Sequence, residues 1–132
     1  LDNLKELGIV DANALQRASF DLVKDGNDVI IHAWTGSGKT LAFFLPLIEN
    51  LMNRSNLPQA LILCASREVA HQIGRVANQV LQGTALRSLV ITGGTNGNRQ
   101  REVLKKTKPQ IIIGTPGRVL ELATMKSKSE GK

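Results

Sequence analysis

The feature that most constrains the fold is a short glycine-rich loop between two apolar stretches of different period. Residues 28–33 form an apolar run, residues 35–40 read Thr-Gly-Ser-Gly-Lys-Thr, and residues 41–52 are apolar with a helical period. A short apolar run favours a buried strand, whereas apolar residues three and four positions apart favour a helix. The sequence therefore predicts a strand over 28–33, a loop, and a helix from Lys39 to Asn53.

This loop has the composition of a phosphate-binding loop. Gly36 and Gly38 can take a positive φ and turn successive backbone N–H groups toward an anion, and the helix that follows adds its free N–H groups and positive dipole end. Lys39 is placed to reach the terminal phosphates, and the Thr40 hydroxyl to ligate a bridging Mg²⁺. We therefore expect Lys39 and Thr40 to carry the chemistry. The expected nucleotide-contacting residues of the loop are Thr35, Gly36, Ser37, Gly38, Lys39 and Thr40. The alternative is a strand-to-helix turn that binds no anion.

The rest of the chain repeats the alternation of strands and helices. Asn13 is a candidate cap for a helix that ends at the turn 25–27, and Ser66 for a helix that ends at Gly83. Further expected elements are strands over 59–65, 89–92 and 110–113 and a polar helix around 99–105. Pro46 should kink its helix or free one carbonyl. Apolar strands that alternate with helices predict an α/β fold, a parallel sheet with helices on both faces.

Four short segments follow the four expected strands. They are the loop 35–40, Ser66-Arg67-Glu68, Gly93-Gly94, and Thr115-Pro116-Gly117-Arg118. Ligands of such folds bind at the carboxyl ends of the strands, so we expect the four segments to share one edge of the sheet. Each segment can also be read as an ordinary turn or helix cap.

The charge is unevenly distributed along the chain. The net charge is +6, but residues 1–50 hold four basic against seven acidic side chains, and residues 51–132 hold thirteen against four. The basic part is free to meet a polyanion, for which nucleic acid is the obvious candidate. A merely solvated basic surface is the alternative.

Length and composition limit the class of protein. A chain of 132 residues with 42% hydrophobic residues is expected to form one domain, with a frayed tail over 126–132. It has no apolar run or leader typical of a membrane span or signal peptide. Cys64 is the single cysteine and lies in an apolar run, so we expect a buried thiol in an intracellular, reducing compartment. The sequence does not decide between cytosol, nucleus and organelle.

Five segments together resemble the first RecA-like domain of DEAD-box RNA helicases. Residues 33–40 resemble motif I, and residues 65–72, Ala-Ser-Arg-Glu-Val-Ala-His-Gln, resemble motif Ia. Gly93-Gly94 matches the glycine doublet of the family, and Thr115-Pro116-Gly117-Arg118 matches motif Ib. Gln16 lies where the family has its adenine-reading glutamine. The resemblance covers nearly the whole chain and implies a RecA-like P-loop NTPase fold.

The resemblance also implies roles for particular residues. Gln16 would read the adenine of ATP with its amide, and Lys39 and Thr40 would hold the phosphates and Mg²⁺. An RNA track, which would contact single-stranded or duplex RNA through its backbone, is implied for Arg67, Gly93, Gly94, Thr115, Pro116, Gly117 and Arg118. A second RecA-like domain would be the partner of this one, and no membrane partner is implied.

The chain also departs from the family. Ala12-Asn13-Ala14 replaces a proline-containing segment before Gln16, Ala65-Ser66 replaces a Pro-Thr pair, and Trp34 stands where a polar residue is usual. The sequence has no Asp-Glu-Ala-Asp motif. We therefore expect residues 1–132 to be a partial domain of an ATP-dependent RNA helicase, not competent alone as an ATPase.

Two other readings compete with this one. One is a different P-loop enzyme, such as a nucleotide kinase or a DNA translocase, but the three segments after the phosphate loop favour the helicase. The other is a non-catalytic RNA-binding or regulatory P-loop module.

Overall fold

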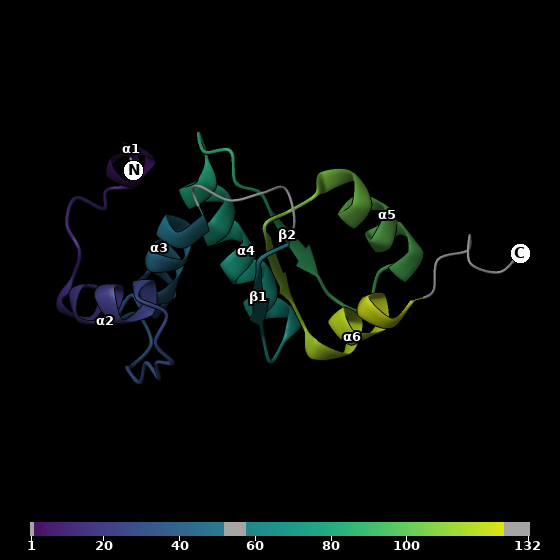
Figure 1. Ribbon diagram of the computed structural model, residues 1–132, viewed down its shortest axis with the longest axis horizontal. Helices are drawn as coiled ribbons and strands as arrows, with labels where there is room; N and C mark the ends of the chain where they lie inside the picture. The colour runs from purple at the N-terminus through teal and green to yellow at the C-terminus, as the bar shows by residue number, and fades with distance from the viewer. Residues whose placement is uncertain (1, 52–57, 126–132) are drawn as a thin grey trace, which may run out of the picture. The chain divides into compact units, whose positions relative to one another are not determined.

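The computed structural model describes residues 2–51 and 58–125, and these fall into two compact units. Unit 1 is drawn from 1–55 and 77–86, and unit 2 from 56–76 and 87–132. Figure 1 shows the elements of both units along the chain.

Unit 1 is helical. It contains α1 (Asp2–Glu6), α2 (Ala14–Lys24), α3 (Lys39–Leu51) and the end of α4 (Arg67–Leu81). Asn13 caps α2 in a capping box: its side chain accepts from the Gln16 amide at 2.9 Å, while the Gln16 side chain accepts from the Asn13 amide at 3.0 Å. Helix α3 buries one side completely, with Phe44 at 0% exposure.

Pro46 lies inside α3 and frees one carbonyl, as the sequence predicts. Proline has no N–H, so the Ala42 carbonyl four residues earlier lacks its helical donor. The Ser19 hydroxyl of α2 lies 2.9 Å from the Leu15 carbonyl of its own helix and 3.3 Å from this oxygen, and Ser19 and Ala42 are both buried. The proline therefore creates an acceptor that helps to join α2 to α3.

Unit 2 is built on a parallel sheet of three strands in the order β1-β3-β2. The strands are β1 (Ala60–Leu63), β2 (Ser88–Ile91) and β3 (Ile111–Gly114), and Leu63 and Ile91 both pair with Gly114. The central strand is the most deeply buried, with Ile111 and Ile113 at 0% exposure. All three strands thus end at the same level, and the chain leaves them at one edge.

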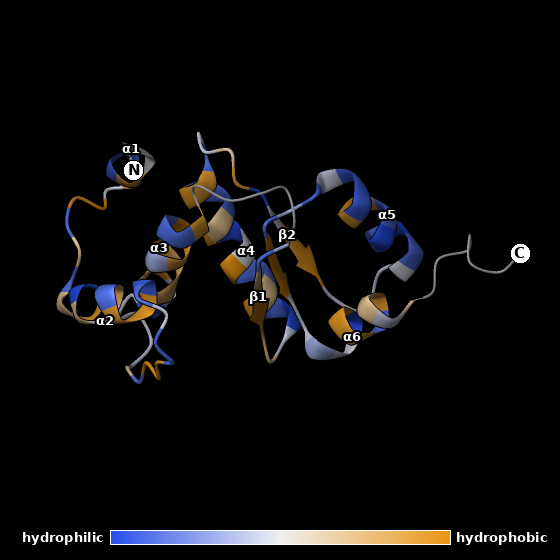
Figure 2. Ribbon diagram, viewed as in Figure 1, coloured by the Kyte–Doolittle hydropathy of each residue, from blue (hydrophilic) through white to orange (hydrophobic). Residues whose placement is uncertain are grey.

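Helices lie on both sides of this sheet. Figure 1 shows α4 on one side, and α5 (Gly97–Thr107) and α6 (Pro116–Thr124) on the other. Gly74 of α4 approaches β2 closely, because a Cβ added there would lie 2.4 Å from Val90 Cγ2. Figure 2 shows the orange, apolar strands between helices that are partly blue. The predicted α/β class with a parallel sheet is confirmed.

One predicted strand is absent. Residues 28–33 form no strand, and Ile30 is 96% exposed. A strand needs a neighbour to pair its backbone N–H and C=O groups, and the three strands among the described residues pair only with one another. Apolar, β-branched composition marks a segment suited to a sheet, but it does not supply the partner.

The other predicted helices and strands begin and end within one or two residues of the observed ones, where the structure describes them. The predicted end of α3 at Asn53 and the tail 126–132 lie outside the described residues. Helix α6 is an element that the sequence analysis did not predict. No helix in the described part of the chain is both long enough and apolar enough to span a bilayer.

Candidate nucleotide and nucleic-acid sites

The phosphate loop has the backbone that its glycines predict. Gly36 and Gly38 have φ values of +85° and +86°, a region that L side chains rarely adopt. Between them the Ser37 amide and hydroxyl donate to the Trp34 carbonyl at 3.2 and 2.6 Å. The loop is therefore a closed turn that leads directly into α3.

Two side chains of the α2 cap hold the end of this loop. The Asn13 amide Nδ2 donates to the Ser37 carbonyl at 2.9 Å, and Gln16 Nε2 lies 3.4 Å from the Gly38 carbonyl. A Cβ on Gly38 would lie 2.7 Å from Gln16 Nε2 and 2.8 Å from Asn13 Nδ2. The absence of a side chain at Gly38 is therefore needed for this contact as well as for its φ.

Gln16 is a loop contact in the structure. It is only 7% exposed, its oxygen accepts from the Asn13 amide, and its nitrogen faces the loop. One of the two Nε2 hydrogens and one lone pair of Oε1 remain for another partner. The adenine-reading role of Gln16 stays a prediction.

The Lys39 ammonium hydrogen-bonds to the Ala33 carbonyl across the loop. An ammonium has three donors, so this bond leaves two of them for other acceptors. The side chain is half-buried. The ammonium group of Lys39 is therefore held against the predicted phosphate loop.

The beginning of α3 offers free donors next to this cation. Within 28–51, the amides of Gly38, Lys39 and Thr40 donate to no backbone acceptor, and the first such bond into the helix runs from Ala42 to the Gly38 carbonyl. The Thr40 hydroxyl forms no hydrogen bond with another described residue. These groups fit a polyphosphate and its metal ion. No cluster of three metal-ligating side chains occurs within 2–51 and 58–125.

Trp34 is 84% exposed beside the loop. Nothing in the structure explains a bulky side chain at this position.

A second site lies at the carboxyl edge of the sheet in unit 2. A pocket of about 700 Å³ is lined by residues that follow each of the three strands: Ala65, Ser66, Arg67, Glu68, Gly93, Gly94, Thr115, Gly117, Arg118 and Glu121. Three of the four segments predicted to meet at one edge do meet there. The fourth, the loop 35–40, belongs to unit 1.

Arg67 and the glycine doublet face each other in this pocket. A Cβ on Gly94, where φ is +86°, would lie 2.5 Å from Arg67 Nη1, and one on Gly93 would lie 3.2 Å from Nη2. Within 58–125, the Arg67 guanidinium forms no hydrogen bond or ion pair. Because Gly93 and Gly94 have no side chains, the exposed Arg67 guanidinium can lie against their backbone, and its N–H donors remain open to the pocket.

The segment Thr115–Arg118 begins α6. Thr115 is the N-cap but its hydroxyl makes no capping bond, and Pro116 follows in the first turn. A Cβ on Gly117 would meet no atom within 4 Å. The N-terminus of α6 therefore presents a hydroxyl, open backbone and free amides to the pocket.

Arg118 is held more firmly than Arg67. Its Nη1 donates to the Thr95 carbonyl and to Gln100 Oε1, each at 2.9 Å, and its Nε donates to Glu121 Oε2 at 3.0 Å. Its side chain is 13% exposed. The sequence predicts Arg118 as a phosphate contact, and the structure shows that it also joins α6 to the loop after β2.

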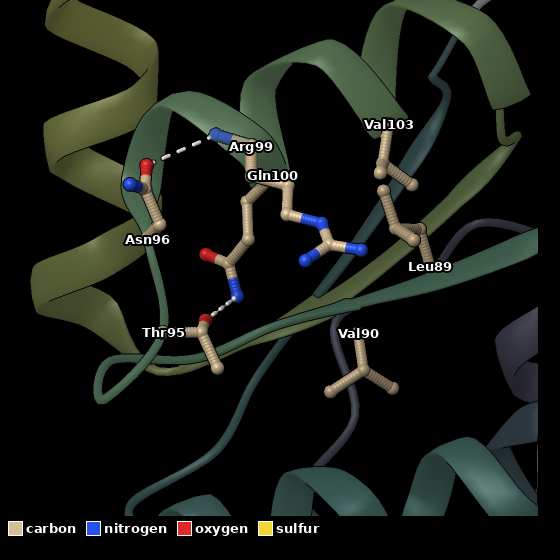
Figure 3. A pocket seen from close by; sticks show the side chains of 7 residues that line it. All are labelled: Leu89, Val90, Thr95, Asn96, Arg99, Gln100 and Val103. Atoms are coloured by element: carbon tan, nitrogen blue, oxygen red, sulfur yellow. Dashed lines mark hydrogen bonds between the residues drawn. The ribbon is translucent and has the colours of Figure 1, made fainter.

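Two further pockets flank these sites. One of about 370 Å³ lies between α2 and α3 and includes Gln16, Phe20 and Leu41. The other, of about 350 Å³, lies between β2 and α5, where Figure 3 shows Arg99 and Gln100 pointing into a space bounded by Leu89.

Cys64 is buried directly after β1, and burial raises the pKa of its thiol.

Two residues that contact these sites could not be assigned to them from the sequence. Asn13 is predicted only as a cap, although its amide also reaches the phosphate loop. Gln100 is not singled out at all, because a polar residue in a polar helix carries no signal in the sequence.

Comparison with known proteins shows the family of the chain. The family model of the DEAD/DEAH box helicase matches residues 13–131, and the chain belongs to this family. It is similar to a probable ATP-dependent RNA helicase, YfmL, of Bacillus subtilis, with 42% identity over 95% of this chain and 33% of that protein. It is also similar to the ATP-dependent RNA helicase CshA of Listeria monocytogenes, with 39% identity over 90% of this chain and 23% of that protein.

Solved structures support the same fold. The structure of Mss116p bound to single-stranded RNA and AMP-PNP has a TM-score of 0.81 and 25% identity, over 91% of this chain and 26% of that one. A hypothetical ATP-dependent RNA helicase from Sulfolobus tokodaii has a TM-score of 0.79, over 93% of this chain and 35% of that one. The predicted RecA-like fold is confirmed. The chain spans between about a quarter and a third of the length of these proteins.

Proposed function

We propose that this chain is the ATP- and RNA-binding part of a DEAD-box helicase that couples ATP binding and hydrolysis to RNA strand separation or remodelling. The observation that carries the proposal is the pocket of about 700 Å³ where the segments after all three strands converge. Family membership and relatives named as ATP-dependent RNA helicases support it. The coupled activity belongs to a protein of the relatives' length, with a second RecA-like domain as partner.

Nucleotide binding is assigned to the loop in unit 1. The free amides at the start of α3 and the Lys39 ammonium would hold the phosphates, and the Thr40 hydroxyl would ligate Mg²⁺. Bound Mg²⁺ would neutralise charge on the phosphate oxygens. Gln16 would contribute its remaining donor and acceptor to adenine.

RNA binding is assigned to the pocket in unit 2. Arg67 supplies a cation with open donors, Thr115 a hydroxyl, and Gly117 a backbone that a sugar or phosphate can approach. Such contacts are to the backbone of RNA, so little base preference follows. Among the described residues of this pocket there is no aromatic side chain on which a base could stack.

The RNA assignment is tested with a labelled single strand and fluorescence anisotropy at several salt concentrations. Contact with two or three phosphates predicts a slope of log affinity against log salt of about −1.4 to −2.1. Arg67→Ala should flatten this slope by about 0.7. The matched control neutralises two exposed cations of α5, Lys105→Gln with Lys106→Gln. If the control abolishes binding and Arg67→Ala leaves the slope unchanged, the pocket is the wrong surface.

The nucleotide assignment is tested separately by calorimetric titration with ADP and Mg²⁺. Lys39→Ala should remove most of the affinity, because it removes the cation at the loop while α3 remains. An unchanged affinity in Lys39→Ala would refute the assignment of the phosphate loop.

A further inference from the structure

Gln100 of α5 connects three parts of unit 2. Its Nε2 donates to the Thr95 hydroxyl at 2.7 Å and to the Thr92 carbonyl at 3.0 Å, and its Oε1 accepts from Arg118 Nη1 at 2.9 Å. Figure 3 shows its amide turned toward Thr95, away from the axis of α5. One side chain therefore ties the ends of the loop 92–95 to the arginine at the start of α6.

The chemistry of the three partners determines the orientation of this amide. The Thr92 carbonyl can only accept and the Arg118 guanidinium can only donate, so the amine must face Thr92 and the oxygen must face Arg118. A flipped amide would bring two acceptors together at one end and two donors at the other. Neither a carboxylate nor an apolar side chain can make both contacts.

The loop and the arginine joined by Gln100 are both parts of the candidate RNA pocket. The loop 92–95 contains Gly93 and Gly94, against which Arg67 lies, and Arg118 lines the same pocket. The three donors on Nε and Nη1 of Arg118 are used by Glu121, Thr95 and Gln100. The two donors on Nη2 bond to no other residue within 58–125. The guanidinium is therefore fixed through Nε and Nη1, and the donors on Nη2 are left for a phosphate oxygen.

We propose that Gln100 is a positioning residue for RNA binding: it holds Arg118 and the glycine-doublet loop in the arrangement that receives the RNA backbone. The inference rests on the proposed RNA-binding function of the same pocket. Gln100 itself contacts no RNA in this assignment. Its effect passes through the two groups that its amide joins.

The test is the salt dependence of RNA binding by the 132-residue chain with Gln100→Met. Methionine has nearly the same length as glutamine and no charge, so the variant removes the hydrogen bonds and keeps the volume. If Gln100 only stabilised the fold, the number of phosphate contacts, and with it the salt slope, would not change. We expect a five- to tenfold loss of affinity, the equivalent of about one ordinary hydrogen bond. We also expect the salt slope to flatten by about 0.7, as if a cation had been lost. Asn98→Met, an exposed site on the same helix, is the matched control and should change neither quantity.

Two further variants make the result decisive. In an Arg118→Ala background, Gln100→Met should flatten the salt slope no further, because both changes remove the same contact, the one between Arg118 and a phosphate. If Gln100→Met does not fold, Gln100→Glu is compared with Asn98→Asp, which adds the same charge two residues away. Gln100→Glu should weaken RNA binding at least fivefold more than Asn98→Asp, because its carboxylate cannot donate to Thr92 and pairs with Arg118 instead.

The outcomes separate this inference from the proposed function. If the unaltered chain binds RNA with the expected slope and Arg118→Ala flattens it, but Gln100→Met changes neither affinity nor slope, the positioning role is refuted and the RNA site stands. Equal effects of Gln100→Glu and Asn98→Asp refute it in the same way. If the unaltered chain shows no binding, or Arg67→Ala and Arg118→Ala have no effect, the proposed function fails and this inference fails with it.

Discussion

The two glycines of the phosphate loop offer a matched pair for measuring how the α2 cap holds the loop. Gly36 and Gly38 have nearly equal φ values, +85° and +86°, so an alanine meets the strain of a positive φ at either position. That strain amounts to about 1–2 kcal/mol. Around Gly36 a new Cβ would meet no atom within 4 Å, whereas at Gly38 it would lie 2.7 Å from Gln16 Nε2. The difference between the variants therefore reports chiefly the contacts with α2.

We expect Gly38→Ala to be less stable than Gly36→Ala by about 1–3 kcal/mol. The new methyl group forces Asn13 and Gln16 away from the loop, and the bonds to the Ser37 and Gly38 carbonyls are lost. Each is worth about 0.5–1.5 kcal/mol. Both variants remove the same chain freedom from the unfolded state, so that effect cancels.

The assay is urea unfolding followed by far-UV circular dichroism, because Trp34 is too exposed to report on folding. A third variant, Gly38→Ala in an Asn13→Ala and Gln16→Ala background, removes the obstructing groups. In that background the extra cost of Gly38→Ala should disappear. Equal stabilities of Gly36→Ala and Gly38→Ala in the original background would show that the α2 cap does not hold the loop.

Three other changes probe the packing of each unit. Ser19→Ala should cost about 0.5–1.5 kcal/mol in urea unfolding, because it removes a buried hydroxyl that lies between the Leu15 carbonyl and the Ala42 carbonyl that Pro46 leaves without a helical donor. Gly114→Ala should destabilise unit 2 by about 1–3 kcal/mol or more, since its Cβ would lie 2.5 Å from the backbone oxygen of Ile91; a stability equal to that of the unaltered chain would contradict this packing. Cys64 should react with thiol reagents far more slowly in the folded chain than in urea. Burial raises the pKa of the Cys64 thiol, so the unfolded chain loses the thiol proton at a lower pH than the folded chain. The free energy of unfolding should therefore fall as pH rises above the ordinary cysteine pKa of about 8.5. Rapid labelling of the folded chain at neutral pH would refute the burial of Cys64.

Local features of the sequence were sufficient where the cause is local. The positive φ of Gly36 and Gly38 follows from their lack of a Cβ, and the Asn13 and Ser66 caps follow from side chains that reach an amide three residues away. The alternation of apolar runs with helical periods predicted the parallel sheet, because strands covered by helices on both faces must be apolar throughout. The residues that gather in the pocket of unit 2 could be predicted because parallel strands end at one edge.

Tertiary structure decided what depends on partners distant in the sequence. Residues 28–33 have the composition of a strand but no neighbour among the described strands, and only the fold shows whether backbone groups are paired. Arg118 could be recognised as a cation from the sequence, but its hydrogen bonds to Thr95 and Gln100 depend on how α5 and α6 meet. Gln100 has no periodic or motif signature, because a hydrogen bond between residues 18 positions apart is specified by packing and not by any local pattern.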